Sequence, residues 1–478
     1  MAERVATLSR LVFGKSSEKA PSPASAEAPQ ATDGADGPVA QPARRRRGQQ
    51  PGSGGHGRRG CSHLPTTEAV HDLPAEQLAC ARCGALYAPF GEETCEQIDW
   101  QVHVRRVVHR RPAYRRGCRC PVRGVLSAPP APEPIAKGRL SAGFLARLLV
   151  EKYVLGRPLR RIAAALSLDG FDVADGSLVG TLKALGGLLA PLEAAVRARN
   201  AASGHLHADE TGWQVFETVD GKANHRWWLW VFLGADTTVF RIEPSRAAKV
   251  LAGHLGVDLG AGTLPDGRAL LLSSDLDTVY QAFGALDGVE PLWCWAHIRR
   301  CFVRAGDAHP ALGGWAAAWV ERIGKLYVAL AAIDRARQAQ TGDPALSAPA
   351  VKVLATLDRE WDGLARHEQY PDAPLDNNTA ERQLRNPVVG RKNCYGSGAV
   401  WAAELAGRVW TVTATAARNG LNPLAYLTDY LNACATAGGR APEGAALQAF
   451  LPWAAAPAQR TSGDNTPDAG PDPPQPDP

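Results

Sequence analysis

The chain has 478 residues, of which 45% are hydrophobic and 21% are charged, and its formal net charge is +5. This length favours more than one domain, and the hydrophobic content is ample for a sizeable core, which excludes a wholly disordered chain. The net charge is too small to identify a partner. Charged side chains interrupt the N-terminal residues, and the apolar runs elsewhere in the chain are short or rich in Ala. No stretch therefore resembles a secretory signal or a membrane span, and we expect a cytosolic protein.

Both ends of the chain are predicted to be disordered. Residues 1–60 are dominated by Ala, Pro, Gly, Ser and Arg without a sustained apolar period, so they cannot bury enough surface to offset their ordering entropy. The four arginines at residues 44–47 make this segment a basic tail that contacts phosphate non-specifically. At the other end, residues 435–478 are expected to be mostly disordered, above all from about residue 455.

Residues 61–125 are predicted to form a small zinc-binding module. Cys80 and Cys83 form a CxxC knuckle, and Cys118 and Cys120 close the segment. Four thiolates complete a tetrahedral zinc site, which allows a segment too small for a good core to fold. The second pair is spaced CxC, so another residue could replace one member: Cys61, Cys95, His103 or His109. The alternative is a set of unrelated reduced cysteines.

The same module carries a predicted DNA-binding surface. Basic residues cluster between residues 44 and 123 with fewer acids among them, and Arg105 and Arg106 open a basic strand that extends to Arg119. Arginines on a strand are suited to the phosphate backbone, which fixes a protein's register on a duplex. We therefore assign Arg105 and Arg106 to DNA binding.

A helical region is predicted at residues 141–200, after a Pro-rich linker at residues 126–140. Apolar residues at helical spacing predict helices over residues 141–155, 159–168 and 176–199. Two short helices joined by a tight Gly-Arg-Pro connection, followed by a third helix, are compatible with a helix-turn-helix unit. Plain helical packing is the alternative.

The region of residues 201–434 is predicted to be an α/β domain with a mixed sheet. Three strands joined by turns precede alternating helices and strands, which is the order of a ribonuclease-H-like fold. The predicted strands are residues 205–217, 225–234, 237–243, 269–274 and 290–295, with helices at residues 246–255 and 278–284. A helical insertion is expected at about residues 305–370, and a last amphipathic helix at residues 423–434.

An acidic pair lies in the first predicted strand, within the stretch HLHADETGW that begins at residue 205. Strand side chains alternate between faces, so Asp209 and Glu210 project to opposite sides of the sheet. One acid is therefore expected to point into a site and the other away from it. His207 shares the face of Asp209 and is expected to be a packed strand residue rather than a ligand.

Two later acids complete a candidate site with Asp209. Asp275 stands where a strand stops, and Glu381 lies about one turn inside a helix that begins near residues 376–377, where Asp or Asn is a good N-cap. Three carboxylates on two strands and a helix are suited to gathering two magnesium ions, which need oxygen ligands and leave room for phosphate and water. The alternative to Asp275 as second ligand is Asp277.

Four basic residues near Glu381 are predicted to line the position of scissile phosphates. They are Arg382, Arg385, Arg391 and Lys392. A simpler alternative for Glu381 is a surface ion pair with Arg385, four residues later on the same helix. His297 follows a Trp-Cys-Trp stretch and is a candidate to contact DNA or to orient a site residue.

Four motifs resemble one known family. They are HADETGW, the strand HRWWLWVFLG, WCWAHIRRCF at residues 293–302, and above all DNNTAERQLRNPVVGRKN at residues 376–393. Together they resemble the insertion-sequence-sixty-six family of bacterial transposases, over roughly residues 71–434. The HDLP and CARCG segments are similar to that family's zinc-binding N-terminal region. The chain departs from the family in lacking N-terminal leucine heptads and in having Cys394 after GRKN.

The resemblance implies a DDE transposase with a ribonuclease-H-like core, in which Asp209, Asp275 and Glu381 bind two divalent cations, magnesium or manganese. Such an enzyme cleaves DNA strands and joins element ends to a target by in-line attack on phosphodiesters. Its implied partners are DNA, further copies of the chain assembled on DNA, and accessory proteins of the element. The alternatives are a zinc-containing DNA-binding protein with an inactive core and a structure-selective nuclease.

Overall fold

The computed structural model describes residues 82–83, 85–86, 104–115, 117, 125–221 and 224–454. The chain divides into two units, one formed by Ser16–Val102 and the other by the rest of the chain. The predicted zinc ligands Cys80, Cys118 and Cys120 lie outside the described residues, as do the predicted disordered residues 1–60 and 455–478, while Cys83 is exposed and free.

A five-stranded mixed sheet forms the centre of the second unit, with the strand order β5-β4-β3-β6-β7. The strands are β3 (His205–Gln214), β4 (Arg226–Leu233), β5 (Thr238–Glu243), β6 (Leu270–Ser274) and β7 (Val289–Trp293). β3, β4 and β5 form an antiparallel meander, whereas β6 and β7 run parallel to β3. The predicted mixed α/β architecture is confirmed, and each predicted strand is present within a few residues.

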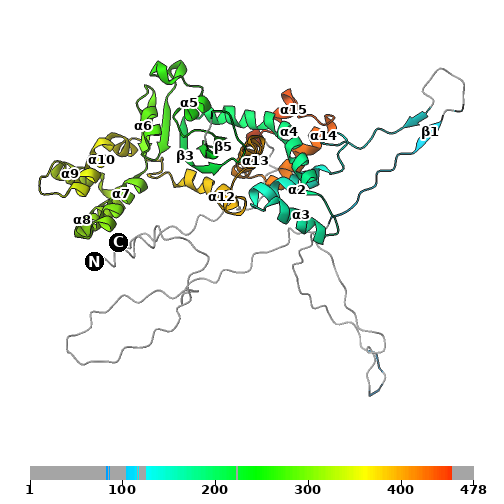
Figure 1. Ribbon diagram of the computed structural model, residues 1–478, viewed down its shortest axis with the longest axis horizontal. Coiled ribbons are helices and arrows are strands. Elements are labelled where there is room, and N and C mark those ends of the chain that lie inside the picture. The colour runs from blue at the N-terminus through cyan, green and yellow to red at the C-terminus, as the bar shows by residue number, and fades with distance from the viewer. Residues whose placement is uncertain are drawn as a thin grey trace. The chain divides into compact units, whose positions relative to one another are not determined.

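Helices follow the strands in the predicted order. The helices between β5 and β7 are α5 (Lys249–Leu255) and α6 (Thr278–Gly284). The residues expected to form a helical insertion are α7 (Trp295–Ala308), α8 (Gly313–Gly324), α9 (Leu326–Gln340), α10 (Ala348–Arg359) and α11 (Trp361–Ala365). Figure 1 shows α7 to α10 gathered beyond the β6 and β7 side of the sheet.

The remaining helices precede or follow the strands of the sheet in the amino-acid sequence. Before it lie α2 (Ala142–Leu149), continued by a π-helical turn at Val150–Val154, then α3 (Leu159–Leu168) and α4 (Asp175–Ala201). After it lie α12 (Asn378–Cys394), α13 (Val400–Arg418), α14 (Pro423–Thr436) and α15 (Gly444–Gln448). The chain beyond residue 434 was expected to be mostly disordered, but α15 and buried Leu451 extend the folded part to residue 454.

The sheet separates two hydrophobic cores. Trp213, Leu229 and Phe240 pack on one face with α2, α4, α13 and α14, whereas Leu206 and Leu272 pack on the other with α5 to α10. Because both faces are covered, the sequence of β4 is apolar nearly throughout instead of alternating. The two residues of each adjacent pair on β3 therefore belong to different cores.

Helix α13, which the sequence analysis did not identify, covers the edge strand β5. The backbone N–H groups of Phe240 and Thr238 donate to Thr411 Oγ1 (2.9 Å) and Thr415 Oγ1 (3.1 Å), so the open side of β5 has partners on α13. A Cβ at Gly407 would meet the Phe240 carbonyl oxygen at 2.9 Å, which explains a glycine at this closest approach. The two threonine hydroxyls thus accept the hydrogen bonds that a sixth strand would otherwise accept, and the glycine allows α13 to approach β5.

Helix α4 is the described helix that is long and apolar enough to span a bilayer by length and composition. Leu178, Leu182, Leu185 and Leu189 on α4 are almost fully buried in the first core. The carbonyl oxygen of Leu188 accepts a hydrogen bond from Tyr430 Oη on α14 at 2.6 Å. These contacts account for the apolar character of α4 through packing inside the fold.

A buried polar cluster joins the end of α4 to the sheet. Asn200 Nδ2 donates to Thr237 Oγ1 (3.0 Å) and to the Phe232 carbonyl (3.2 Å), while Asn200 Oδ1 accepts from His254 Nε2 at 2.7 Å. The His254 ring stacks on Phe232 with centroids 4.1 Å apart. Burial, followed by the nearby charges of three arginines, lowers the pKa of His254 to about 3.

We predict that His254 makes folding stability depend on pH. The unfolded histidine binds a proton below about pH 6.5, but the folded one does so only near pH 3. Stability is therefore lost as the pH falls through this window, by about 2 kcal/mol at about pH 5. Urea denaturation of the wild type and His254→Gln at about pH 7 and pH 5 should show a smaller loss in the variant. Equal losses would contradict the assignment.

Candidate active site

The acidic pair on the central strand is divided between the two faces of the sheet. The Glu210 side chain is 1% exposed, and its Oε1 pairs with Arg246 Nη2 at 2.6 Å. Tyr280 on α6 donates its hydroxyl to Glu210 Oε2. Burial raises the pKa of Glu210, and the hydrogen bonds from Tyr280 and Arg246 oppose that shift. Glu210 is thus fixed by an ion pair with Arg246 and by a hydrogen bond from Tyr280 on α6.

Asp209 has a different environment. Its Oδ1 accepts a hydrogen bond from the Glu210 backbone N–H at 2.9 Å, and within the described part of the chain it has no ion-pair partner. Burial raises the pKa of Asp209 well above its usual range, and the negative charges of Glu210, Glu381 and Asp275 raise it further. The three acids predicted from the sequence therefore lie within electrostatic reach of one another.

Asp275 and Asp277 have distinct roles at the end of β6. Asp277 is the N-cap of α6, where its Oδ1 accepts from the Val279 N–H at 3.2 Å, and its Oδ2 pairs with Arg246 at 2.9 Å. Asp275 Oδ1 accepts from the Asp277 N–H at 2.9 Å. Among the described residues Asp275 forms no ion pair. Asp277 is therefore occupied by the helix and by Arg246, whereas Asp275 has neither role.

Glu381 lies in the first turn of α12, which Asn377 holds against the central strand. Asn377 is 1% exposed, and its Nδ2 donates to the Ala208 carbonyl at 2.8 Å, next to Asp209. Its side chain makes no capping hydrogen bond to α12, although it occupies the N-cap position. Its backbone N–H donates to Cys294 Sγ at 3.2 Å, immediately before α7. The asparagine expected to be a helix cap instead positions the helix.

His297 on α7 faces the acids. Its Nε2 lies 3.8 Å from Glu381 Oε1, while its buried Nδ1 has no hydrogen-bond partner within the described residues. Burial lowers the pKa of His297, and the negative charges of Asp275 and Glu381 counter part of this shift. The sequence left open whether His297 contacts DNA or orients a site residue, and the structure puts it beside Glu381.

The two strand histidines next to Asp209 are packed, as expected for His207. His207 Nδ1 lies 3.2 Å from Asn377 Oδ1, and His205 Nε2 lies 2.9 Å from Ser273 Oγ. Their rings are 4.5 Å apart. Burial, followed by the charges of His207 and His367, lowers the pKa of His205 to about 4. These uncharged rings line the strand on the side of Asp209.

The donor set fits divalent cations in charge and chemistry. Asp209, Asp275 and Glu381 supply carboxylate oxygens, the ligands that magnesium prefers, and two of them have no cationic partner in the described chain. Across the described residues, no group of three or more His, Cys, Asp or Glu side chains stands in metal-binding geometry. The carboxylates are thus gathered but would have to close around an ion.

The predicted basic residues of α12 fall into two groups. Arg382, Arg385 and Lys392 are exposed, whereas Arg391 is half-buried and donates to the Gly212 carbonyl of β3. Arg391 therefore joins the helix to the strand, and its predicted contact with phosphate stays a prediction. The sequence carried no signal for the contact with β3.

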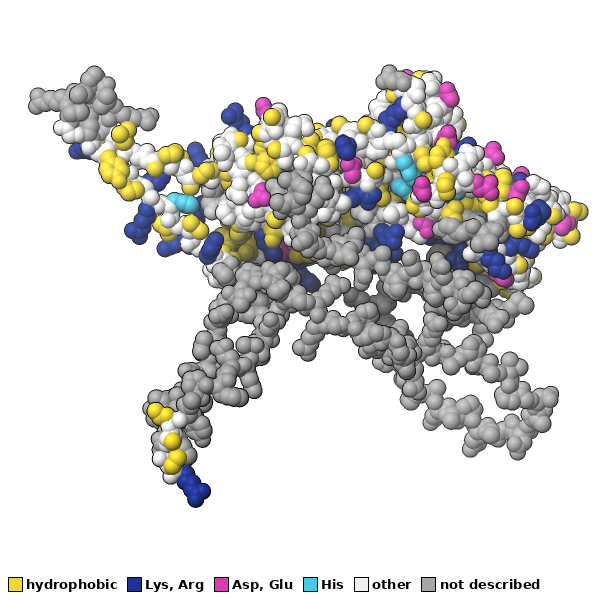
Figure 2. All heavy atoms as spheres, turned by 180° about the vertical axis from the view of Figure 1, so that it is seen from behind, with side chains coloured by type: hydrophobic (Ala, Val, Ile, Leu, Met, Phe, Trp, Pro, Cys, Tyr) yellow, Lys and Arg dark blue, Asp and Glu magenta, His cyan; other side chains and the backbone are white. Residues whose placement is uncertain are grey.

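Arg105 and Arg106 lie in an extended, exposed segment before the hairpin of β1 (Ala113–Arg115) and β2 (Val125–Ser127). Figure 2 shows Lys and Arg side chains spread along this arm without acidic ones. Its described residues have the charge and exposure expected of a surface that contacts phosphate.

Several supporting residues escaped the sequence analysis. Arg246 and Tyr280 hold Glu210, and Asn377 holds α12, yet each is an ordinary residue in its local segment. Their partners lie tens of residues or more away in the chain, so no spacing rule links them. For Glu210 a weak signal existed, since a strand acid on a buried face needs a cationic partner.

Comparison with known proteins identifies the family whose sequence model this chain matches. Residues 137–405, more than half of the chain, match the sequence model described as Transposase IS66 family. The uncharacterized protein y4qI of Sinorhizobium fredii is 26% identical over 438 residues, which cover 82% of this chain and 76% of that protein. The uncharacterized protein y4jD of the same organism is 25% identical over 432 residues, covering 82% and 80%. The family match spans Asp209, Asp275 and Glu381.

We predict that Asn377 contributes to stability through its contacts with β3. Asn377→Ala leaves the buried Ala208 carbonyl and His207 without this partner, which should lower the free energy of unfolding by about 1–3 kcal/mol. The matched control is Asn378→Ala, whose side chain bonds the half-buried Asp376 and should cost about 0.5 kcal/mol or less. Chemical denaturation measures both. Equal destabilisation by the two changes would show that Asn377 does not anchor α12.

Proposed function

Because the chain belongs to the Transposase IS66 family, we propose that it cleaves and transfers DNA strands, using Asp209, Asp275 and Glu381 as the metal-binding acids of a DDE-type site. The observation that carries the proposal is the position of Asp209, which is partly buried, has no ion-pair partner among the described residues and lies close enough to Asp275 and Glu381 for their charges to raise its pKa. Three carboxylates that repel one another without enough cationic partners are an arrangement that divalent cations would stabilise. A ribonuclease-H-like core is part of the proposal and is supported by the strand order.

Each acid has a defined task in this mechanism. Asp209, on the central strand, would hold the ions together with the other two acids. Asp275 would contribute its carboxylate from the end of β6, and Glu381 from the first turn of α12. Two magnesium or manganese ions supply activation of the attacking water or 3′-hydroxyl and stabilisation of the leaving oxygen. The protein forms no covalent bond to DNA in this scheme and acts by positioning charge.

The neighbouring groups support the acids without competing for the ions. Arg246 neutralises Glu210 and Asp277, so these two carboxylates are withdrawn from the site. His297 lies next to Glu381, where it can hold the carboxylate in orientation. Arg382 and Arg385, exposed on α12, would contact the DNA backbone beside the scissile phosphate. Assembly of several copies on DNA stays a prediction.

The decisive test compares conservative variants of the acids on DNA that carries the inverted repeats flanking the coding region. Asp209→Asn, Asp275→Asn and Glu381→Gln should each lower magnesium-dependent cleavage by on the order of a thousandfold or more while DNA binding stays nearly unchanged. Asp277→Asn is the matched control, and it should retain cleavage. Because Asn caps a helix as well as Asp does, the expected loss of stability, about 1 kcal/mol or less, comes from the ion pair with Arg246.

Two outcomes would reject the assignment. If Asp277→Asn abolishes cleavage and Asp275→Asn does not, the second acid is wrong. If the wild type binds DNA but never cleaves it, the core is inactive and the protein is a DNA-binding protein. Hydrolysis of branched DNA without joining of ends would instead identify a structure-selective nuclease.

The zinc-binding module is a separate part of the proposal. We predict about one equivalent of tightly bound zinc in the purified protein, held by Cys80, Cys83, Cys118 and Cys120. Metal analysis of Cys80→Ser and Cys83→Ser should find the zinc lost, whereas Cys301→Ser, a partly buried cysteine of α7, should retain it. Purified wild-type protein without zinc would overturn the module.

A further inference from the structure

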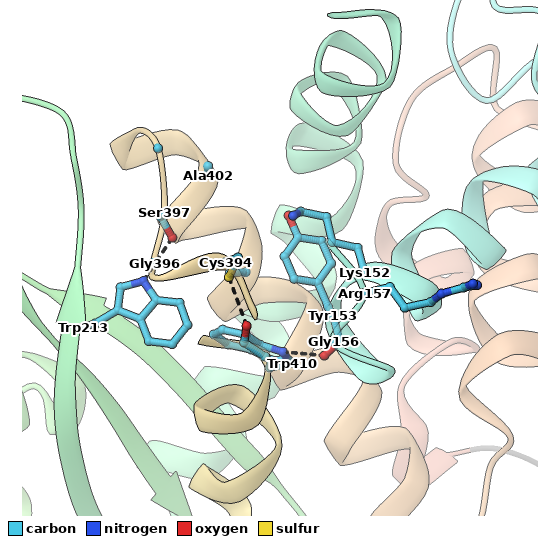
Figure 3. Close-up of a pocket in the computed structure, with 13 residues that line it drawn as sticks. Lys152, Tyr153, Gly156, Arg157, Trp213, Cys394, Gly396, Ser397, Ala402 and Trp410 are labelled. Carbon is cyan, nitrogen blue, oxygen red and sulfur yellow. Dashed lines mark hydrogen bonds between the residues drawn. The ribbon is translucent and has the colours of Figure 1, made fainter. Parts of the chain in front are cut away.

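A cavity of about 90 Å³ lies where the turn after α2, the end of α12 and the start of α13 meet. Its lining includes Lys152, Tyr153, Trp213, Cys394, Ser397 and Trp410. Figure 3 shows Trp213 and Tyr153 on either side of Cys394, with Trp410 below. The rings of Trp213 and Trp410 meet edge to face with centroids 5.5 Å apart. The cavity therefore has aromatic walls.

The aromatic walls are fixed in place by hydrogen bonds. Trp213 Nε1 donates to Ser397 Oγ at 3.1 Å, and Trp410 Nε1 donates to the Tyr153 carbonyl at 2.9 Å. The loop that carries Ser397 is held to β3 by a hydrogen bond from the Ser397 N–H to the Gln214 carbonyl (2.9 Å), and a Cβ at Gly396 would meet the same oxygen at 2.3 Å. The indole N–H groups are satisfied, so the walls present apolar ring surface to a ligand.

The cavity also contains a cation without a counter-charge. Burial lowers the pKa of Lys152, and no carboxylate lies within ion-pair distance of its ammonium group in the part of the chain that the structure describes. The ammonium lies 5.4 Å from the centre of the Tyr153 ring. Nearby Arg157 is different, because it pairs with Glu151 at 2.8 Å. A half-buried, unpaired ammonium attracts an anion, and a phosphate is the anion DNA offers.

The position of the cavity relative to the acids is set by two elements. Trp213 lies four residues after Asp209 on β3, a separation of roughly 13 Å at the rise of a strand. Gly390, which also lines the cavity, lies nine residues after Glu381 on α12, again roughly 13 Å. Both lengths equal about four nucleotide steps of one strand in duplex DNA.

The size of the cavity selects among ligands. An engineered apolar cavity of roughly 150 Å³ admits benzene. The present cavity of about 90 Å³ is smaller, so it can take only part of a single pyrimidine ring, and the sugar and phosphate stay outside it. A two-ring purine fits less well.

We propose that this cavity binds a single pyrimidine nucleotide turned out of the DNA stack, with its base between the aromatic walls and its phosphate at Lys152. The proposal rests on the proposed function only in taking DNA as the partner. Stacking on aromatic side chains compensates for the base stacking that the nucleotide loses. The cavity would thereby hold the strand a few nucleotides from the phosphate to be cut.

The test measures binding by fluorescence anisotropy in EDTA, with a short duplex that carries one bulged thymidine and the same duplex without the bulge. The wild type should bind the bulged duplex about tenfold more tightly. Lys152→Gln removes the cation, and Ala402→Phe fills the cavity, so both should bring the ratio close to one. Lys183→Gln is the matched control, since Lys183 lies over the Trp401 ring outside the cavity and should leave the ratio unchanged.

A ratio near one for the wild type, or an unchanged ratio in both cavity variants, would overturn the proposal. A bulged adenosine that binds as well as thymidine would reject the preference for a pyrimidine. Because the measurement excludes metal, it is independent of cleavage. A protein that discriminates the bulge but never cleaves DNA would refute the catalytic proposal alone, whereas cleavage without discrimination would refute the cavity alone.

Discussion

The hydrogen bonds of Asn377 to β3 are the constraint on which the candidate site depends. Asn377 and Ala208 are 169 residues apart in the sequence, and the bond between them brings the start of α12 to the middle of the sheet. Because the bond ends one residue before Asp209, any shift of α12 along β3 would separate Glu381 from Asp209. Arg391 makes a second connection further along the same two elements. The site is thus built on a strand and a helix joined at two points.

The two acids of the central strand differ in role because their side chains are buried in different surroundings. Glu210 is buried in an ion pair with Arg246, which also binds Asp277, so its desolvation is compensated and breaking the pair would leave an uncompensated charge. Asp209, on the other face, gains negative neighbours instead of a cation. Leaving one acid in this state while its neighbour is paired costs stability, which is typical of sites that bind a charged ligand and supports the proposed role of Asp209.

Local pattern predicted the strands and most helices of the core, because alternation, turn residues and apolar runs are properties of short segments. The opposite faces of Asp209 and Glu210 follow from the same period. The long-range contacts could not be predicted. Nothing near Arg391 indicates that it binds the Gly212 carbonyl, and nothing near Thr411 indicates that it accepts from the edge of β5. The carboxylates were identifiable one by one because of their chemistry, but the residues that bring them together were not.

The cavity and the acids lie on the same two elements, β3 and α12, so the fold fixes the distance between them. Both elements run from the acids towards the cavity, and regular hydrogen bonding fixes the length of each. A nucleotide held between Trp213 and Tyr153 would therefore keep a nearby phosphate at a set distance from Asp209. The free energy of binding this nucleotide would then help to orient the reacting phosphate, as contacts remote from the reacting bond do in other enzymes. Cys394, at the end of α12, lines the same cavity with a small side chain.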